Sequence, residues 1–584
     1  MLVHFVCAII CLGGRDPRDR PINERTARTP TSDAREGLHN LVSSGCGRAV
    51  RRGDRGMTQI LNRPEVGDLA ALVEEVARST EEGVKRFVEP ASGTLRRASL
   101  KRHHIVFGRR GSGKTSLLRK AAADLTVDRR PIAFVDLEPF KGHSYPDVLI
   151  SVLIASFTRF QEWLNTAAVH SATKTSFWNR LFGAKPKRPS FNREQAAALA
   201  GTLGQLAREL DTVLKQADNA ELQRVTRRDQ ERARERHAGL GISAAGSASV
   251  GVTAGVTAGA TDTTRAGDET QEVYRRSKID LLHSRVLEYR DILRTLTAFG
   301  EGPSFLFLDD LYHIRRADQA QVLDYFHRIA KGNNLWLKIG TIQHRSRWYV
   351  HGDPPIGLKL GDDADKIDLD LTLEKYSLTK GFLTTILKNL VQECSAPLIG
   401  DFVTPGALDR LVLASGGVAR DFLGVFRRSI SEARERLERD SSHYRGPKIG
   451  AEDVNVAAGK YGDVKLEEFS RDTQEDQGRL EEAFARIRVF CILKANANCF
   501  LLDQDARGTD IDLIQELVDL RLVHRVRTGV TVSGRIGKRY NAYMLDVSQY
   551  TGSRKRRQLE MVEFWTRGSR ERLRRASLIY VPQP

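Results

Sequence analysis

The sequence predicts an α/β fold with a parallel sheet, and three observations support this prediction. Short apolar runs, typical of buried strands, alternate with helical patterns in two parts of the chain, residues 104–160 and 304–340. A glycine-rich loop at residues 108–115 joins the first strand to the first helix. A later strand ends in two aspartates at residues 309–310. The long stretch between the two parts is expected to be a helical insertion.

Composition limits the class of protein. The 584 residues allow about two to four domains, and their net charge is +18. Such a basic surplus favours a polyanionic partner, usually nucleic acid and less often anionic lipid. The alternative explanation is a proteome that is basic on average, together with basic tails on this chain. The six cysteines show neither zinc spacing nor a disulfide framework, so we expect a cytoplasmic protein. No segment has the pattern of a transmembrane helix.

The first 56 residues are expected to lie outside the folded core. Residues 1–12 are apolar but lack the basic start and the cleavage site of a signal peptide. Residues 13–56 are rich in Arg, Gly, Ser and Pro and show no periodicity. We therefore predict a disordered leader, or an upstream extension of the reading frame with Met57 as the natural start.

The glycine-rich loop reads GRRGSGKT and matches G-x-x-x-x-G-K-[ST] between a strand at 104–107 and a helix at 116–123. This context is typical of a P-loop, whose backbone N–H groups and helix N-terminus bind phosphate. A glycine turn before a surface helix is the alternative. Lys114 is predicted to reach the β- and γ-phosphates of ATP or GTP, and Thr115 to hold Mg²⁺. The predicted phosphate-binding residues are Gly108, Gly111, Ser112, Gly113, Lys114, Thr115 and Ser116.

A second strand at 131–137 and an apolar helix at 148–160 complete the first part of the core, residues 57–165. Residues 166–300 are predicted to be a helical insertion with a coiled-coil-like stripe. Its tip, residues 239–263, is rich in Gly, Ala, Ser and Thr. The tip is either a flexible linker or a hairpin that touches a partner or a membrane, and the arm offers a surface to a protein partner. The stripe consists of Leu199, Leu203, Leu206, Leu210 and Val213.

The second part of the core, residues 301–373, begins with the strand that ends at the aspartate pair. This is a Walker B pattern, in which Asp309 is predicted to hold Mg²⁺ through water and Asp310 to polarise the attacking water. A strand that ends in a solvated turn is the alternative. The next strand ends at Thr341, which is predicted to sense the γ-phosphate. Arg345 or Arg347 is either an arginine finger for a neighbouring subunit or a surface residue.

The P-loop, the aspartate pair and the polar strand end together resemble AAA+ ATPases. Residues 417–420, Gly-Val-Ala-Arg, are similar to the sensor 2 motif of the origin-recognition and replication-initiator branch. The resemblance covers about residues 60–165 and 300–550 and implies Mg²⁺-dependent ATP hydrolysis in an ATP-dependent homo-oligomer. It further implies that Arg420 contacts the γ-phosphate from a helical lid, residues 374–440. The catalytic residues so predicted are Asp310, Lys114, Thr341 and Arg420.

That branch carries a winged helix after the lid, and residues 481–550 supply a candidate, with a linker at 441–480 and a basic tail at 551–584. The helix at 510–520 carries four acidic residues, which disfavour contact with phosphates. DNA contact is therefore expected from the wing at 527–539 and from tail residues 553–575.

Two functions are consistent with these patterns. The first is a DNA-associated AAA+ ATPase, an initiator- or loader-like switch or motor that uses ATP to control assembly. The alternative is a NACHT/NB-ARC-like signalling ATPase, for example in defence, in which the winged helix clamps the nucleotide.

Overall fold

A computed structural model describes most of the chain. The described residues are 60–76, 82–127, 130–170, 193–215, 278–300, 302–439, 446–472, 477–507, 509–555, 558–566 and 568–582. The predictions for the leader at 1–56, for Met57 as the start and for the tip at 239–263 lie outside these ranges. Among the described residues, no helix is both long enough and apolar enough to span a membrane.

The core is a five-stranded parallel sheet in the order β2-β3-β4-β1-β7. Its strands are β1 (His103–Phe107), β2 (Ile132–Asp136), β3 (Ser304–Asp309), β4 (Leu335–Thr341) and β7 (Ala364–Asp368). Every residue of β1 and β3 is buried, as expected for central strands of a sheet covered on both faces. The predicted α/β P-loop fold is thereby confirmed at the level of the parallel sheet and its helices.

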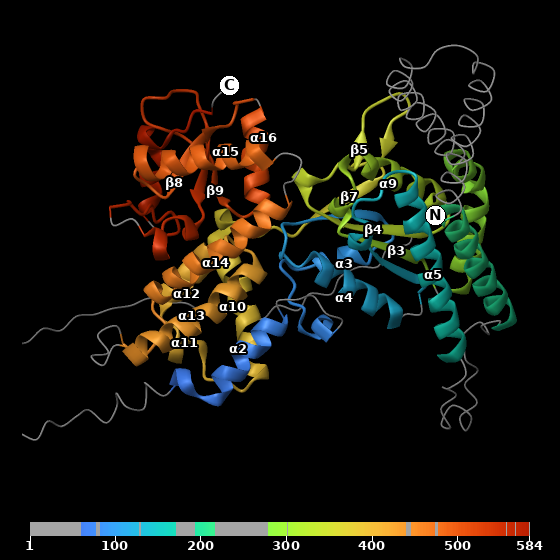
Figure 1. Ribbon diagram of the computed structural model, residues 1–584, viewed down its shortest axis with the longest axis horizontal. Helices are drawn as coiled ribbons and strands as arrows, with labels where there is room; N and C mark the ends of the chain where they lie inside the picture. The colour runs from blue at the N-terminus through green and yellow to red at the C-terminus, as the bar shows by residue number, and fades with distance from the viewer. Residues whose placement is uncertain are drawn as a thin grey trace, which may run out of the picture. The chain divides into compact units, whose positions relative to one another are not determined.

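Helices cover both faces of the sheet (Figure 1). Alternate residues of β1 point to opposite faces, so Val106 packs under α3 and α4 whereas Ile105 and Phe107 pack on the other side. The helices are α3 (Thr94–Ala98) and α4 (Lys114–Val127) on one face, and α5 (Asp147–His170) and α9 (Arg316–Ala330) on the other. A two-stranded ribbon, β5 (Tyr349–Val350) with β6 (Ile356–Gly357), lies beyond β4 in the chain.

The described ends of the insertion are two helices, residues 193–215 and 278–299, and they pack on the core. Tyr289 stacks edge-on against Phe157 of α5, with ring centroids 5.1 Å apart. Lys278 pairs with Asp147 at the start of α5 at 2.7 Å. The leucine stripe predicted at 199–213 is therefore buried largely against the core domain in this part of the chain.

The lid consists of helices in the predicted segment, which pack with an N-terminal helix into one core. They are α2 (Pro64–Val76), α10 (Tyr376–Glu393), α11 (Ile399–Phe402), α12 (Pro405–Ser415) and α13 (Ala419–Arg439). The hydroxyl of Thr404 accepts a hydrogen bond from the N–H of Ala407 and caps α12, and Gly416 ends that helix in the left-handed region.

The prediction of a linker at 441–480 is wrong for most of that segment. A 22-residue helix, α14 (Ala451–Asp472), runs through it and packs on α12 and α13. Its buried positions include the small residues Ala457 and Ala458, which carry a weak hydrophobic signal in the sequence.

The C-terminal domain is a small antiparallel sheet, in the order β8-β10-β9, with two helices. Its elements are α15 (Gln477–Val489), β8 (Cys499–Asp503), α16 (Thr509–Asp519), β9 (Val523–Val530) and β10 (Tyr540–Leu545). A single π-helical turn at Phe490–Lys494 extends α15. Strand β8 is absent from the sequence prediction, whereas α16 corresponds to the helix predicted at 510–520.

The described part of the predicted basic tail, 551–584, is folded onto this sheet rather than extended. Val562, Phe564, Leu573 and Leu578 are buried, and Ile579 forms a bridge to Leu501 of β8. The segment contains short 3-10 helices at Gly552–Arg554, Ser569–Arg574 and Ala576–Leu578. The apolar side chains between the arginines supply the contacts that a purely basic tail would lack.

Candidate nucleotide-binding site

A cavity of about 230 Å³ opens at the carboxyl end of β1, between the P-loop and the lid. The carboxyl ends of parallel strands are the usual ligand site of such sheets. Its polar lining includes P-loop residues 110–116, Asp310 and Arg420, together with Arg86, Glu138 and His313. Its apolar lining comprises Val76, Phe87, Val88, Pro90, Leu117, Leu369, Phe382, Ile386, Ala419 and Leu423. Core and lid therefore enclose one site with both charged and apolar lining.

The P-loop has the backbone that a phosphate cradle needs. Gly111 and Gly113 have φ of 81° and 98°, in the left-handed region that favours glycine. The ammonium of Lys114 donates to the carbonyl oxygens of Gly108 at 3.0 Å and Arg109 at 3.3 Å. Burial lowers the pKa of Lys114, against the attraction of the two Walker B aspartates. The loop thus holds a buried cation at its centre.

Thr115 and Asp309 supply the oxygen ligands that suit Mg²⁺. The Thr115 hydroxyl hydrogen-bonds the Asp309 carboxyl, which is 2% exposed at the end of β3. Burial, with repulsion from Asp310, raises the pKa of Asp309 to about 7. On the neighbouring strand β4, a Cβ on Gly340 would lie 2.4 Å from Asp309 Oδ1, so this position has room only for glycine. A divalent cation here would offset the unfavourable burial of the carboxylate.

Asp310 follows directly and lines the cavity. Its backbone is left-handed, with φ of 57°, which turns its side chain away from the strand direction of Asp309. Burial raises its pKa, and the charge of Lys114 opposes that effect. A carboxylate with a raised pKa inside a phosphate site is a suitable base for a water molecule.

The lid contributes Arg420, which lines the cavity from the first turn of α13. The N–H of Arg420 donates to the carbonyl of Gly111 at 3.3 Å. A Cβ on Gly111 would lie 2.7 Å from Cβ of Arg420, so the close approach of lid to loop depends on glycine. The predicted sensor 2 residue is therefore beside the P-loop.

Thr341 is not brought to the cavity. It is fully buried, and its hydroxyl hydrogen-bonds that of Ser346, while its carbonyl accepts from the N–H of Gly108 at 3.2 Å. Arg345 lies nearer the site, because its guanidinium is 5.6 Å from the ring centre of Tyr312, which lines the cavity. Arg347 is exposed.

Sequence reasoning missed the residue that ties the loop to the lid, Arg109. Its buried guanidinium pairs with Asp370 at 3.2 Å and donates to the carbonyls of Leu371 at 3.1 Å and Gly416 at 3.0 Å. The backbone N–H of Arg109 also donates to Asp370. The P-loop pattern leaves this position unspecified, and its partners lie more than 250 residues away in the chain.

The acidic helix α16 packs against the domain of the parallel sheet. Asp519 accepts from the N–H of His344, in the turn after β4, at 3.1 Å. Glu516 lies 3.8 Å from the guanidinium of Arg316 on α9. Burial, together with the charge of Asp370, raises the pKa of Asp519 to about 7. The helix that would enter a DNA groove in a winged helix is thus packed against the chain itself.

We expect this contact to make stability depend on pH. Because the pKa of Asp519 is raised by folding, its protonated form stabilises the folded state, and this stabilisation is lost as pH rises through about 7. Relative to wild type, the thermal unfolding midpoint of Asp519→Asn should therefore rise by a few degrees between pH 5.5 and pH 8. Asp505→Asn, at an exposed position before α16, should show no such change relative to wild type. Equal pH profiles for Asp519→Asn and wild type would contradict this assignment.

Comparison with known proteins finds distant structural neighbours, which include an ORC1 protein and a Walker-type ATPase. No family model matches the chain, and no curated protein sequence matches it. The ORC1 protein of Aeropyrum pernix, solved in complex with DNA, has a TM-score of 0.31 and 13% identity, over 79% of this chain and 91% of that one. A Walker-type ATPase of Pyrococcus abyssi has a TM-score of 0.34 and 12% identity, over 78% and 94%. With TM-scores this low, the fold assignment rests on this chain's own sheet and P-loop.

Proposed function

We propose that the chain is a Mg²⁺-dependent ATPase of the AAA+ type that acts as an ATP-controlled switch. The observation that carries the proposal is the single cavity that Lys114, Asp310 and Arg420 share, from the P-loop, the Walker B strand and the lid. The polar lining suits a triphosphate and the apolar lining suits a nucleobase. Self-association on ATP binding, which the family resemblance implies, is part of the proposal.

Each charged group has a role in this scheme. Lys114 exchanges its loop carbonyls for phosphate oxygens, and the P-loop N–H groups bind the same oxygens. Asp310 orients the attacking water and takes its proton. Arg420 neutralises charge that develops on the γ-phosphate. Thr115 and Asp309 would hold Mg²⁺, which supplies further charge neutralisation when bound.

We further propose that residues 477–550 form a winged helix and that its wing contacts DNA. The loop between β9 and β10 has exposed basic side chains and a fully exposed Ile536. The exposed basic residues are Arg535, Lys538 and Arg539 in this loop and Arg527 in β9. Lys538 pairs with Asp503 at 2.9 Å, and several basic residues of the predicted tail also form ion pairs, among them Arg554 with Asp463 at 2.7 Å and Arg575 with Glu560 at 2.8 Å. The wing is therefore the better candidate for phosphate contact.

DNA retention on filters across a salt series, with and without Mg-ATP, tests this function. We expect ATP-dependent binding that weakens with salt, and we expect Arg535→Ala with Arg539→Ala to weaken it about tenfold and to reduce the salt slope by about 2. Arg554→Ala with Arg575→Ala is the matched control and should change binding by less than about threefold. No retention at the lowest salt, or an equal loss in the control, would contradict the DNA role.

A signalling ATPase remains the second candidate, and the packing of α16 favours it. The helix contacts the core through Asp519 and Glu516, which suits a regulatory clamp rather than a DNA reader. A closed monomer that copurifies with ADP and retains no DNA would support this candidate over the first.

A further inference from the structure

Arg521 lies where three parts of the chain meet: the C-terminal domain, the lid helix α13 and the helix α14. It is the second residue after the end of α16, it is 3% exposed, and its φ is 65°. Glycine is the residue that helices usually place in this left-handed conformation after their last turn. An arginine at this position indicates that its side chain is needed there.

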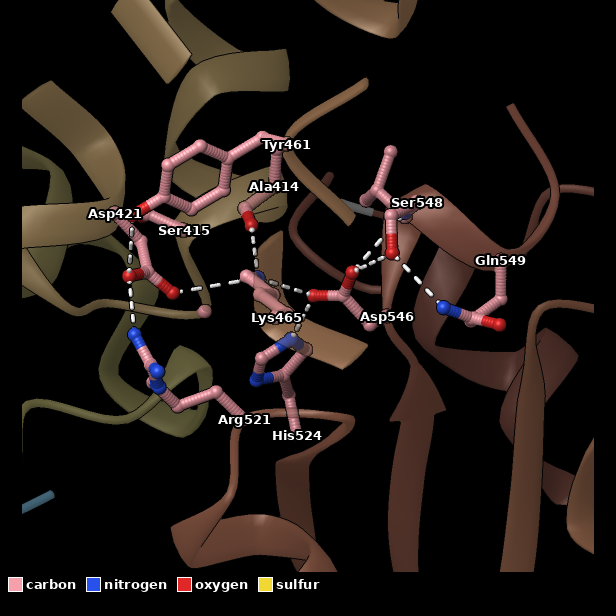
Figure 2. A network of polar contacts seen from close by, with 12 residues as sticks. Ala414, Ser415, Asp421, Tyr461, Lys465, Arg521, His524, Asp546, Ser548 and Gln549 are labelled. Atoms are coloured by element: carbon pink, nitrogen blue, oxygen red, sulfur yellow. Dashed lines mark hydrogen bonds and ion pairs between the residues drawn. The ribbon is translucent and has the colours of Figure 1, made fainter. Parts of the chain in front are cut away.

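The guanidinium of Arg521 joins two helices, and Figure 2 shows its contact with Asp421. One terminal nitrogen donates to Oδ1 of Asp421 at 2.5 Å, and the other pairs with Glu468 of α14. Asp421 is fully buried and directly follows Arg420, the lid arginine of the nucleotide cavity. The pair therefore holds the first turn of α13 through the residue next to Arg420.

The same carboxylate belongs to a larger buried network, seen in Figure 2. The ammonium of Lys465 lies 3.3 Å from Asp421 Oδ2 and 2.8 Å from Asp546 Oδ2. His524 hydrogen-bonds Asp546 at 2.7 Å, and Tyr461 donates to Asp421 at 3.2 Å. The lid, α14 and the C-terminal domain thus share one set of buried charges.

Such a network specifies an arrangement more than it adds stability. Burying the charges costs solvation, and removing one partner leaves another charge without compensation. The first turn of α13 can shift relative to the C-terminal domain and α14 only if the ion pairs of Asp421 with Arg521 and with Lys465 break at the same time. On the nucleotide side, the same turn is held by the N–H of Arg420 on the carbonyl of Gly111.

We propose that Arg521 is a positioning residue for ATP turnover, which acts through Asp421 to hold Arg420 at the γ-phosphate while the C-terminal domain is docked. This inference rests on the proposed role of Arg420. It adds that a partner which displaces α16 releases the lid arginine, so the C-terminal domain controls turnover from a distance. Arg521 itself does not touch the nucleotide.

The test compares steady-state ATP hydrolysis of the full chain in matched variants. Arg521→Gln should lower kcat by about tenfold to a hundredfold with a smaller change in KM, because a misplaced arginine loses charge stabilisation in the transition state. Arg521→Lys should retain part of the rate. Arg436→Gln is the control, since Arg436 forms a comparably buried lid ion pair with Asp453 at 2.8 Å away from the cavity. It should lower the unfolding midpoint by a similar amount and leave kcat within about threefold.

A double-mutant cycle separates this inference from the proposed function. Adding Arg521→Gln to Arg420→Ala should cause no further loss, because both act through one group. Normal turnover in Arg521→Gln, or losses that multiply in the double variant, would overturn the inference while Arg420→Ala still shows its own defect. Normal turnover in Arg420→Ala would overturn the role of Arg420 and the inference with it. If Arg521→Gln does not fold, Glu468→Gln replaces it, because Glu468 is partly exposed. Its kcat should then fall about tenfold, beyond the range expected for Arg436→Gln. A kcat in Glu468→Gln within that range would overturn the inference.

Discussion

Asp310→Asn should bind Mg-ATP with near wild-type affinity and hydrolyse it at least about a hundredfold more slowly, since general-base catalysis contributes about 10²- to 10⁴-fold. The amide keeps the size of the carboxylate but cannot take a proton from water. Asparagine also tolerates the left-handed backbone of this position, so the loop should keep its shape. Phosphate release and nucleotide titration on the same preparation measure the two effects.

Asp136→Asn is the matched control for this variant. Asp136 ends the adjacent strand β2, in register with Asp309, and its exposed carboxylate accepts from the N–H of Glu138 at 3.0 Å. It should hydrolyse ATP within about threefold of wild type. If Asp310→Asn turns over ATP as fast as Asp136→Asn, the base is another group.

Lys114→Ala should weaken ATP binding by at least about a hundredfold. The ammonium lies at the centre of the loop, and charge-assisted hydrogen bonds to phosphate are each worth about 1.5–3 kcal/mol. Titration with a fluorescent ATP analogue in Mg²⁺ measures the loss.

The control for this second variant is Lys120→Ala on the same helix. Lys120 is on the surface and pairs with Asp124 at 2.8 Å, so its removal should leave affinity unchanged within about twofold. A Lys114→Ala protein that is folded by thermal scan and still binds ATP normally would show that the P-loop does not hold the phosphates.

The parts of the site that local patterns encode could be predicted from the sequence. The strand, glycine turn and helix around Lys114 are contiguous, and the apolar run that ends at Asp309 is short, partly aromatic and preceded by Gly and Pro, which favours a buried strand. Arg420 required a resemblance to a known motif, because its approach to Gly111 joins segments more than 300 residues apart.

The parts that depend on distant partners could not be predicted. Arg109 occupies a position that the P-loop pattern leaves open, and its contacts with Asp370 and Gly416 exist only in the folded chain. Arg521 and Lys465 look like surface residues in the sequence but are buried with Asp421. Charged residues give no hydrophobic signal, so their burial is evident only from the structure.

Two elements were missed for a different reason. Helix α14 buries small residues, so its apolar stripe is weak and the segment was predicted as a linker. Strand β8 is five residues long and follows closely after the π-helical turn that extends α15. Because apolar residues occur in both elements, the sequence pattern does not show where the helix ends and the strand begins. Short or weakly amphipathic elements gain their stability from tertiary packing, which a single sequence does not show.

Hydrogen–deuterium exchange of the full chain with and without Mg-ATP tests the central claim most directly. If one nucleotide is enclosed between core and lid, amides of residues 108–116 and of residues 416–423 should become protected together, although the chain separates them by 300 residues. In Lys114→Ala, Mg-ATP should protect neither residues 108–116 nor residues 416–423 from exchange. Protection of the P-loop with an unchanged lid, or of neither segment, would contradict the site proposed here.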